Sequence, residues 1–349
     1  MKTIGWKRMA TALVILLLIV ALAGCGAVQS SPSANSNQNA AQTSQKGKTI
    51  KVALIPKAIG IPYFTGAEQG AQSVAAALNI KLTYNGPTTL SASDQVSMIN
   101  SYVAEGYNVI AVSANDPTSL APALKAAMKK GVKVITWDSD TVPDARQFFV
   151  NQATVDGIGS TLVKVVADHF KGKQTDVAIL SSTPSNTNQN QWIDAMKKTI
   201  ADKYPNLHIK TIQYDQGQPS TGVSATENIV KGFPTVKAII SPDSVGLPAA
   251  AEAVEKLGLQ GKIYVTGLAD PVVMKKYVDD GTVQKYVLWN VLDLGKLTMN
   301  VARAVADGTM PTSGTFKVKG LGDFQVNNGQ VLLGLPMIFD KAATDKYNF

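Results

Sequence analysis

Residues 132–140 read Val-Lys-Val-Ile-Thr-Trp-Asp-Ser-Asp, a β-branched apolar run that ends abruptly in a polar cluster. This pattern is typical of a buried parallel strand at the point where it leaves its sheet. Ligands of open α/β sheets bind beyond the carboxyl ends of the strands, so Trp137, Asp138 and Asp140 stand where a polar ligand would be held. The stretch therefore predicts a parallel sheet with a binding site at one edge.

The segments around this stretch alternate between strand and helix patterns. Strands are expected at 49–56, 80–84, 109–114 and 132–137, with helices at 65–78, 93–104 and 117–130 between them. A second series follows 148–150, with helices at 155–170, 190–201, 221–230 and 247–257 and strands at 177–181, 209–214, 238–241 and 264–266. The repetition predicts an α/β protein with two similar lobes, each a parallel sheet flanked by helices.

The last third of the chain is expected to connect the two lobes. Residues 283–289 are predicted to form a strand that returns toward the first lobe, 293–306 a helix with one apolar stripe, and 315–319 and 332–339 edge or hinge strands. We assign 49–150 and 290–320 to an N-terminal lobe, and 151–289 and 321–349 to a C-terminal lobe. Several crossings between lobes predict a hinge and a cleft that can close on a small ligand.

The first 48 residues have the features of an export signal and a tether. Lys2, Lys7 and Arg8 precede the purely apolar stretch 12–22, which is too short for a comfortable membrane span and is placed like a signal-peptide core. The following Leu-Ala-Gly-Cys resembles the lipobox of bacterial lipoproteins, so 1–24 is expected to be a signal peptide and Cys25 to be acylated. Residues 25–48, rich in Ser, Asn and Gln, then form a tether. We expect the protein on the extracytoplasmic face of the cell membrane, held only by lipid.

Composition excludes several classes of protein. The net charge is +8, and +5 without the three basic residues of the signal segment, too diffuse to favour nucleic acid. Cys25 is the only cysteine, so no disulfide, thiolate nucleophile or cysteine metal site is expected in the folded part. His169 and His208 lack metal-ligand spacing, and neither a Gly-x-Ser-x-Gly elbow nor a phosphate loop occurs. We expect a monomer that is not an enzyme and has no cofactor or metal.

Charged side chains at the ends of first-lobe strands are candidates for recognising hydroxyls. Lys57 follows the first predicted strand and Asp138 the fourth. Donor-only lysine and acceptor-only carboxylate form charge-assisted hydrogen bonds, which contribute about 1.5–3 kcal/mol each. Asp138 and Asp140 would also suit general acid and base roles, but no nucleophile or metal site accompanies them. Asp140 is equally compatible with capping the next segment.

The second lobe offers polar loops at 181–192 and 241–244, both running into helices. One of their residues is expected to cap a helix, but the density of amides also suits hydroxyl recognition, since amides donate and accept. Aromatic residues near predicted strand ends or cleft edges are candidates for stacking on a small ring, although each alone is compatible with a core position; they are Tyr63, Phe64, Trp137, Trp192 and Trp289.

Several of these stretches, taken together, resemble the LsrB family of autoinducer-2 binding proteins in the type I periplasmic sugar-binding superfamily. The matching stretches are 55–57 (Ile-Pro-Lys), 85–88 (Asn-Gly-Pro-Thr), 136–140, 188–192 (Asn-Gln-Asn-Gln-Trp), 242–243 with 247–251, and 346–349. The resemblance implies the type I periplasmic binding protein fold. It also implies that the hydrated cyclic form of dihydroxypentanedione, without boron, is bound and delivered to the permease of an ABC importer.

Carried over residue by residue, the family's ligand contacts become Lys57, Asp138, Asn188, Gln189, Pro242 and Ser244. Two positions depart from the family pattern, because Asn188 replaces an aspartate and Ser244 an alanine. Asparagine keeps an acceptor and gains donors, so it can still bond a hydroxyl, though without charge assistance. Asn188→Asp restores the family's usual residue and is expected to bind as tightly as the parent or better. The alternatives are a binding lipoprotein for a pentose or a deoxyhexose such as rhamnose and, from another class, an enzyme acting on such a sugar.

Overall fold

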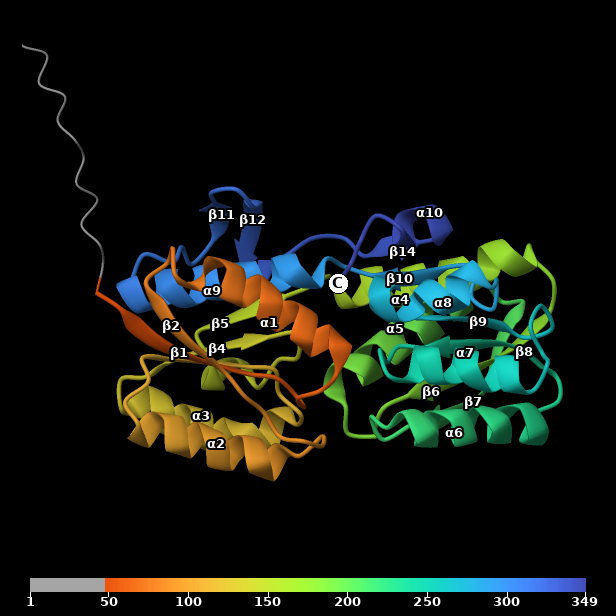
Figure 1. Cartoon of the computed structure of the whole chain (residues 1–349), viewed down its shortest axis with the longest axis horizontal. Helices are drawn as coiled ribbons and strands as arrows, with labels where there is room; N and C mark the ends of the chain where they lie inside the picture. The colour runs from red at the N-terminus through yellow and green to blue at the C-terminus, as the bar shows by residue number, and fades with distance from the viewer. Residues whose placement is uncertain (1–47) are drawn as a thin grey trace, which may run out of the picture. The chain divides into compact units, whose positions relative to one another are not determined.

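The computed structural model describes residues 48–349 (Figure 1). The predicted signal peptide, Cys25 and all of the tether except Lys48 lie outside these residues. No described helix is long and apolar enough to cross a membrane.

The first lobe is built on an eight-stranded sheet with the order β11-β12-β13-β5-β4-β3-β1-β2. Its parallel strands are β1 (Ile50–Ile55), β2 (Ile80–Tyr84), β3 (Val109–Val112), β4 (Lys133–Trp137), β5 (Phe148–Asn151) and β13 (Gln330–Leu332). The antiparallel strands β11 (Gly314–Val318) and β12 (Gly322–Asn327) extend one edge. Helices α1 (Pro62–Ala75) and α9 (Val291–Asp307) lie on one face, and α2 (Ala92–Ala104) and α3 (Pro117–Lys129) on the other (Figure 1).

Alternating side chains of this sheet enter two separate cores. In β1, Val52 and Leu54 belong to the apolar cluster under α1 and α9, whereas Ala53 and Ile55 belong to the cluster under α2 and α3. All four are at most 1% exposed. This two-residue period, with both faces covered, explains why the strand reads as a continuous apolar run.

The second lobe contains a four-stranded parallel sheet with the order β7-β6-β8-β9. Its strands are β6 (Thr175–Ser181), β7 (Leu207–Tyr214), β8 (Val236–Ser241) and β9 (Tyr264–Gly267). The helices of this lobe are α4 (Val155–Phe170), α5 (Thr187–Lys203), α6 (Pro219–Gly232), α7 (Gly246–Lys256), α8 (Pro271–Asp279) and α10 (Lys341–Thr344). A pair of short antiparallel strands, β10 (Tyr286–Leu288) and β14 (Met337–Phe339), lies beside them. The predicted α/β fold with two parallel sheets flanked by helices is confirmed.

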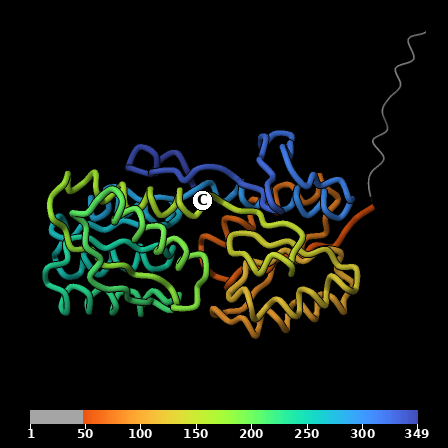
Figure 2. Tube along the Cα trace, turned by 180° about the vertical axis from the view of Figure 1, so that it is seen from behind, coloured from red at the N-terminus to blue at the C-terminus, as the bar shows by residue number. Residues whose placement is uncertain are grey.

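The chain passes three times between the lobes, from β5 to α4, from β10 to α9 and from β13 to β14. Figure 2 shows the last of these crossings in blue. The assignment of 321–349 as a whole to the C-terminal lobe was wrong for β12 and β13, which join the first sheet. The reason is that β13 pairs in parallel with β5 and so covers an edge of β5 that would otherwise be unpaired.

Helix α9 returns to the first lobe and packs closely on α1. A Cβ atom at Gly70 would lie 1.9 Å from the main-chain oxygen of Leu292, and one at Gly295 would lie 1.9 Å from that of Ala67. Glycine at both positions therefore lets the two backbones approach. Helix α1 begins at Pro62, earlier than the predicted Thr65, and proline is favoured at a first helical position.

Candidate functional site

A cavity of about 500 Å³, partly open to solvent, lies between the two lobes. The first lobe contributes Lys57, Ile61, Tyr63, Phe64, Leu90 and Asp138 to its lining. The remaining lining residues are Ser182, Asn186, Asn188, Gln189, Trp192, Gly217, Pro242, Asp243, Ser244, Leu268, Leu288 and Trp289.

The polar lining residues follow the carboxyl ends of strands from both sheets. Lys57 comes two residues after β1 and Asp138 directly after β4, while Ser182 follows β6 and Pro242 follows β8. The parallel strands of each sheet point their carboxyl ends toward the same edge, which explains why residues far apart in the sequence meet here.

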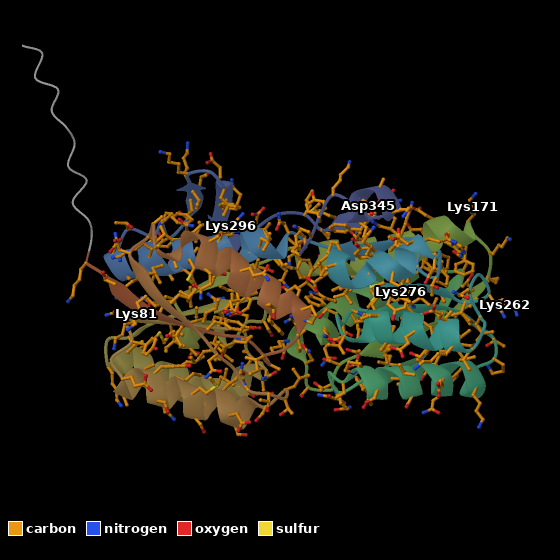
Figure 3. The ribbon with its side chains drawn as sticks, viewed as in Figure 1. Lys81, Lys171, Lys262, Lys276, Lys296 and Asp345 are labelled. Atoms are coloured by element: carbon orange, nitrogen blue, oxygen red, sulfur yellow. The ribbon has the colours of Figure 1, made fainter. Side chains whose placement is uncertain are left out.

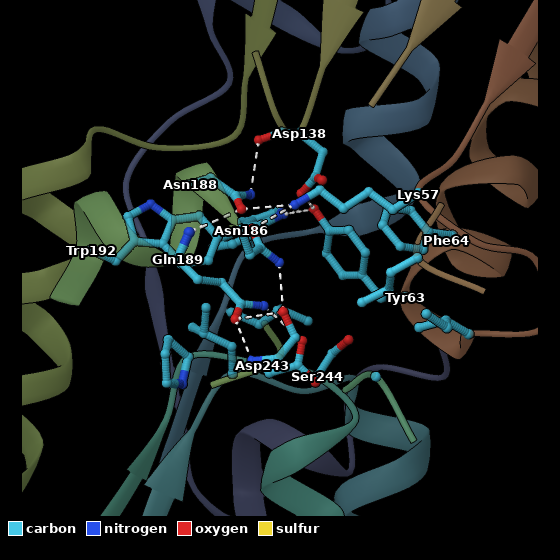
Figure 4. A pocket seen from close by; sticks show the side chains of 18 residues that line it. Lys57, Tyr63, Phe64, Asp138, Asn186, Asn188, Gln189, Trp192, Asp243 and Ser244 are labelled. Carbon is cyan, nitrogen blue, oxygen red and sulfur yellow. Dashed lines mark hydrogen bonds between the residues drawn. The ribbon is translucent and has the colours of Figure 1, made fainter. Parts of the chain in front are cut away.

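Lys57 is the charged group that connects the two lobes. Lys81 and Lys276, which are labelled in Figure 3, are exposed, whereas Lys57 is only 4% exposed. Its ammonium donates to Asn186 Oδ1 at 2.8 Å and to Asn188 Oδ1 at 2.9 Å (Figure 4). Burial lowers the pKa of Lys57 below its ordinary value, against the opposing effect of two nearby carboxylates.

Asp138 is a buried carboxylate held by two hydroxyls. Ser113 Oγ donates to its Oδ2 at 2.6 Å, and Tyr63 Oη donates to its Oδ1 at 2.9 Å. Burial raises the pKa of this carboxyl, while the charge of Lys57 and the two hydroxyls act in the opposite direction. Its backbone has φ = 60°, an uncommon conformation that aspartate tolerates better than most residues.

On the second lobe, Gln189 is fixed at both ends of its amide. Its Oε1 accepts from Ser181 Oγ at 2.6 Å, from Ser182 N at 2.8 Å and from Ser182 Oγ at 3.0 Å. Its Nε2 donates to Asp243 Oδ1 at 2.7 Å, and Asp243 Oδ2 accepts from the main-chain N–H groups of Val245 and Gly246, both at 2.9 Å. The loop after β8 is therefore attached to the start of α5.

A second acid lies behind Asp243. Asp215 has no exposed surface, and its Oδ1 accepts from Gly217 N at 2.7 Å. Burial, followed by the charge of Asp243, raises the pKa of Asp215 to about 9. At neutral pH this raised pKa keeps the Asp215 carboxyl protonated.

Aromatic side chains form much of the apolar wall. Trp289 Nε1 donates to Tyr63 Oη at 3.1 Å, and the Tyr63 ring meets those of Phe64 and Trp289 edge to face at 5.1 and 5.9 Å. Trp192 and Trp289 lie 6.1 Å apart, centre to centre. These aromatic residues, together with Leu268 and Leu288, form an extensive apolar surface beside the polar groups of the cavity. Such a surface can pack against the apolar face of a small ring.

The structure brings together ten of the twelve residues singled out from the sequence for ligand contact. Trp137 and Asp140 do not line this cavity. Trp137 has no exposed surface and packs edge to face on Phe64, because its side chain turns into the core on the α1 and α9 face of the sheet. Asp140 pairs with Arg146 at 2.8 Å and accepts from Thr136 Oγ1, so it fixes the loop after β4 instead. Cys25 lies outside the described residues.

Sequence reasoning missed Asn186, Asp243, Ser182 and the leucines of the wall. Asn186 and Asp243 lie in the two polar loops noted from the sequence, but no spacing rule separates an amide that faces the cleft from one that faces solvent. The sequence did not indicate that the leucines line a cavity, because apolar residues near a strand usually belong to the hydrophobic core. Across residues 48–349, no group of three or more His, Cys, Asp or Glu side chains is arranged to hold a metal ion.

Comparison with known proteins places this geometry in a family. A family model described as a periplasmic binding protein domain matches residues 52–310. The ribose import binding protein RbsB of Bacillus subtilis is 22% identical over 211 residues, covering 60% of this chain and 67% of that protein.

Two solved structures have the same TM-score of 0.82. One is an ABC transporter solute-binding protein from Clostridium phytofermentas with bound L-rhamnose, 32% identical over 86% of this chain and 98% of that one. The other is LsrB from Clostridium saccharobutylicum in complex with AI-2, 30% identical over 86% of this chain and 100% of that one. The chain belongs to the family of periplasmic binding protein domains.

Proposed function

We propose that this protein is the solute-binding component of an ABC importer and binds a small, neutral, polyhydroxylated ligand between its lobes. The observation that carries the proposal is the cavity itself, where Lys57 and Asp138 of the first lobe face Asn188 and Gln189 of the second (Figure 4). Hydrogen-bonding groups from both lobes converge on one space, and a ligand held there favours the closed arrangement.

The ligand we propose is autoinducer-2 in its hydrated cyclic form, taken up as a quorum signal. Lys57, Asp138, Gln189 and Pro242 have the identities expected from the family pattern, and all four line the cavity. The likeness to LsrB over almost its entire length supports the same ligand. The apolar surface from Leu268, Leu288 and the aromatic residues suits a ligand that carries a methyl group on a polar ring.

L-Rhamnose is the second candidate. The solute-binding protein that holds L-rhamnose is as similar to this chain in structure as LsrB is, and its sequence identity to this chain is slightly higher. Asn188, which replaces the aspartate of the autoinducer-2 family, lies in the cavity and contacts Lys57, so the departure affects a group that would meet the ligand. Both candidates carry a methyl group and several hydroxyls, so the same wall suits both.

We also propose that the protein acts without catalysing a reaction, as its relatives named for ribose import and rhamnose binding do. Acylation of Cys25 would hold it at the outer face of the cell membrane beside the permease. Labelling cells with a radioactive or alkyne-tagged fatty acid should mark the parent protein and leave Cys25→Ala unmarked and released from the membrane. Equal labelling of both would contradict the anchor.

Mass spectrometry of small molecules released from the purified protein by heat should identify the ligand. The masses of dihydroxypentanedione and of a deoxyhexose differ, so one experiment separates the two candidates. Protein purified from cells that make autoinducer-2 should release it, and release of rhamnose would favour the second candidate. A charged ligand or a peptide in the eluate would contradict both.

A further inference from the structure

Hydrogen bonds run in a single direction across the second-lobe wall of the cavity. Lys57 Nζ donates to Asn186 Oδ1 at 2.8 Å, and Asn186 Nδ2 donates to Ser182 Oγ at 2.6 Å. Ser182 Oγ donates to Gln189 Oε1 at 3.0 Å, and Gln189 Nε2 donates to Asp243 Oδ1 at 2.7 Å. Every member of this chain is at most 8% exposed. An ammonium therefore stands at one end and a carboxylate at the other.

The two ends determine how the amides between them are turned. An ammonium has only donors, so the oxygen of Asn186 must face Lys57, and its nitrogen then faces Ser182. An ionised carboxylate only accepts, so the nitrogen of Gln189 must face Asp243, and its oxygen faces the serines. Chains in which every bond points the same way polarise and strengthen one another, so each link supports the orientation of the next.

With the side-chain amides turned this way, their oxygens already accept hydrogen bonds from the protein, whereas some of their N–H groups have no protein acceptor. Gln189 Oε1 already accepts three bonds, and Asn188 Oδ1 accepts from Lys57 and from Gln189 N at 3.0 Å. In contrast, the side-chain nitrogens of Asn186, Asn188 and Gln189 each donate one protein bond and have a second hydrogen. On the first-lobe side, Asp138 is acceptor-only when ionised.

We propose that the second lobe recognises its ligand through N–H donors, and that Asn186 and Ser182 are positioning residues that fix this arrangement. The inference rests on the proposed binding function and deepens it. The ligand would direct oxygen lone pairs, from hydroxyls or a ring oxygen, toward Asn186, Asn188 and Gln189. It would direct hydroxyl hydrogens toward Asp138.

The first test examines the series of hydrogen bonds from Lys57 to Asp243 without any ligand. Gln189→Glu replaces the donor that faces Asp243 with a second carboxyl, and Gln191→Glu makes the same change two residues further along α5, at an exposed side chain. Urea unfolding of the full chain should show a much lower midpoint for Gln189→Glu than for Gln191→Glu at pH 8. The gap should narrow by pH 5, because the pKa of the introduced carboxyl rises beside Asp243. Equal midpoints at both pH values would overturn the proposed orientation.

The second test measures ligand affinity by calorimetry, with autoinducer-2 and L-rhamnose as separate probes. Asn186→Ala removes both links at this position and should weaken binding about tenfold or more. Asn190→Ala is the control, because that partly exposed amide donates only to the main-chain oxygen of Pro184. Affinity in Asn186→Ala equal to that of Asn190→Ala would remove Asn186 from any positioning role.

A pH profile separates positioning from general structural support. Loss of the Lys57 proton at high pH would remove a donor to Asn186 and Asn188, so ligand binding should weaken in alkaline solution. Asn186→Asp keeps an acceptor for Lys57 and adds a charge that raises the pKa of Lys57, so this loss of binding should move to higher pH than in the parent. Asn190→Asp should leave it in place. The other titratable groups near Lys57 are Asp138 and Asp243, both present in every variant, and Tyr63, whose pKa is raised well above its ordinary value. An unmoved alkaline limb in Asn186→Asp would contradict the inference.

The two tests fail independently. If the parent binds neither probe, the proposed function is wrong and the unfolding comparison alone judges the hydrogen-bond chain. If the parent binds a probe while Gln189→Glu and Gln191→Glu unfold alike, the binding function stands and the inference about donors is overturned.

Discussion

Asn188 Nδ2 donates to the main-chain oxygen of Asp138 at 3.3 Å, which joins the start of α5 in one lobe to the end of β4 in the other. The same amide accepts from Lys57 through its oxygen. Asn188 thus uses both ends of its side chain to connect the lobes. An aspartate has only acceptors and cannot make both bonds.

This contact reverses the sequence-based expectation for Asn188→Asp. The carboxylate would gain charge attraction to Lys57, but it would face the carbonyl oxygen of Asp138 without a hydrogen between them. We predict several-fold weaker ligand binding than in the parent, since an unsatisfied buried acceptor costs about 1–3 kcal/mol. Calorimetry at pH 7 measures this, and tighter binding than the parent would show that the ion pair outweighs the lost contact.

Asp138 and Asp140 offer a matched pair of neighbouring carboxylates with different roles. Asp138→Asn keeps the side-chain shape and tolerates φ = 60°, but it removes the charge that a ligand hydroxyl would meet, so affinity should fall more than about a hundredfold. Asp138→Ala should be no better. Asp140→Ala should bind like the parent but unfold more easily, by about 1–2 kcal/mol, because Arg146 loses its partner. Weakened binding in Asp140→Ala alone would contradict the assignment.

The order of strands and helices could be predicted from the sequence because it depends on patterns within short segments of the chain. Continuous apolar runs marked the buried parallel strands, and the polar residues directly after them marked the carboxyl edge where Lys57 and Asp138 lie. The same logic failed for Trp137, since an indole at a strand end can turn into the core or into the cleft with the same sequence pattern. The structure resolves the choice through its packing on Phe64.

The parts that sequence did not predict depend on contacts between distant segments. Strand β13 pairs with β5 although about 180 residues separate them in the chain. The sequence of a strand only three residues long does not indicate which distant strand it will pair with. Asp140 was equally compatible with cleft and loop roles until Arg146 was placed beside it. The two acids Asp215 and Asp243 come from different strand ends, so their electrostatic coupling appears only in the folded chain.

Burial of Asp215, together with the charge of Asp243, predicts a dependence of stability on pH. The pKa of Asp215 is about 9 in the folded chain and about 3.9 in the unfolded chain, so its ionisation opposes folding increasingly as pH rises from about 4 to 9. Asp215→Asn stays neutral and retains an acceptor for Gly217. Relative to the parent, it should gain at least about 1 kcal/mol at pH 9, with the difference smallest near pH 4. Urea unfolding across this range measures it, and a constant difference would place the titration elsewhere.

Two helical glycines with different surroundings should respond in opposite ways to replacement by alanine. Gly70→Ala would drive a methyl group into the backbone of Leu292 and should destabilise the fold by about 1–3 kcal/mol. Gly232→Ala lies at the exposed end of α6, where the added carbon would meet no other segment of the chain within 4 Å, and should stabilise the fold by up to about 1 kcal/mol. Thermal unfolding of the two variants compares them directly, and a stable Gly70→Ala would mean that α9 can shift outward.

Titration of the parent protein with autoinducer-2 and with L-rhamnose, after removal of any retained ligand by unfolding and refolding, tests the central claim most directly. We predict saturable one-to-one binding of autoinducer-2, with a weaker or absent response to L-rhamnose, and loss of the signal in Asp138→Asn. Tight binding of L-rhamnose alone would transfer the assignment to the second candidate. No heat of binding for either ligand, in a protein that refolds to its native stability, would contradict the account.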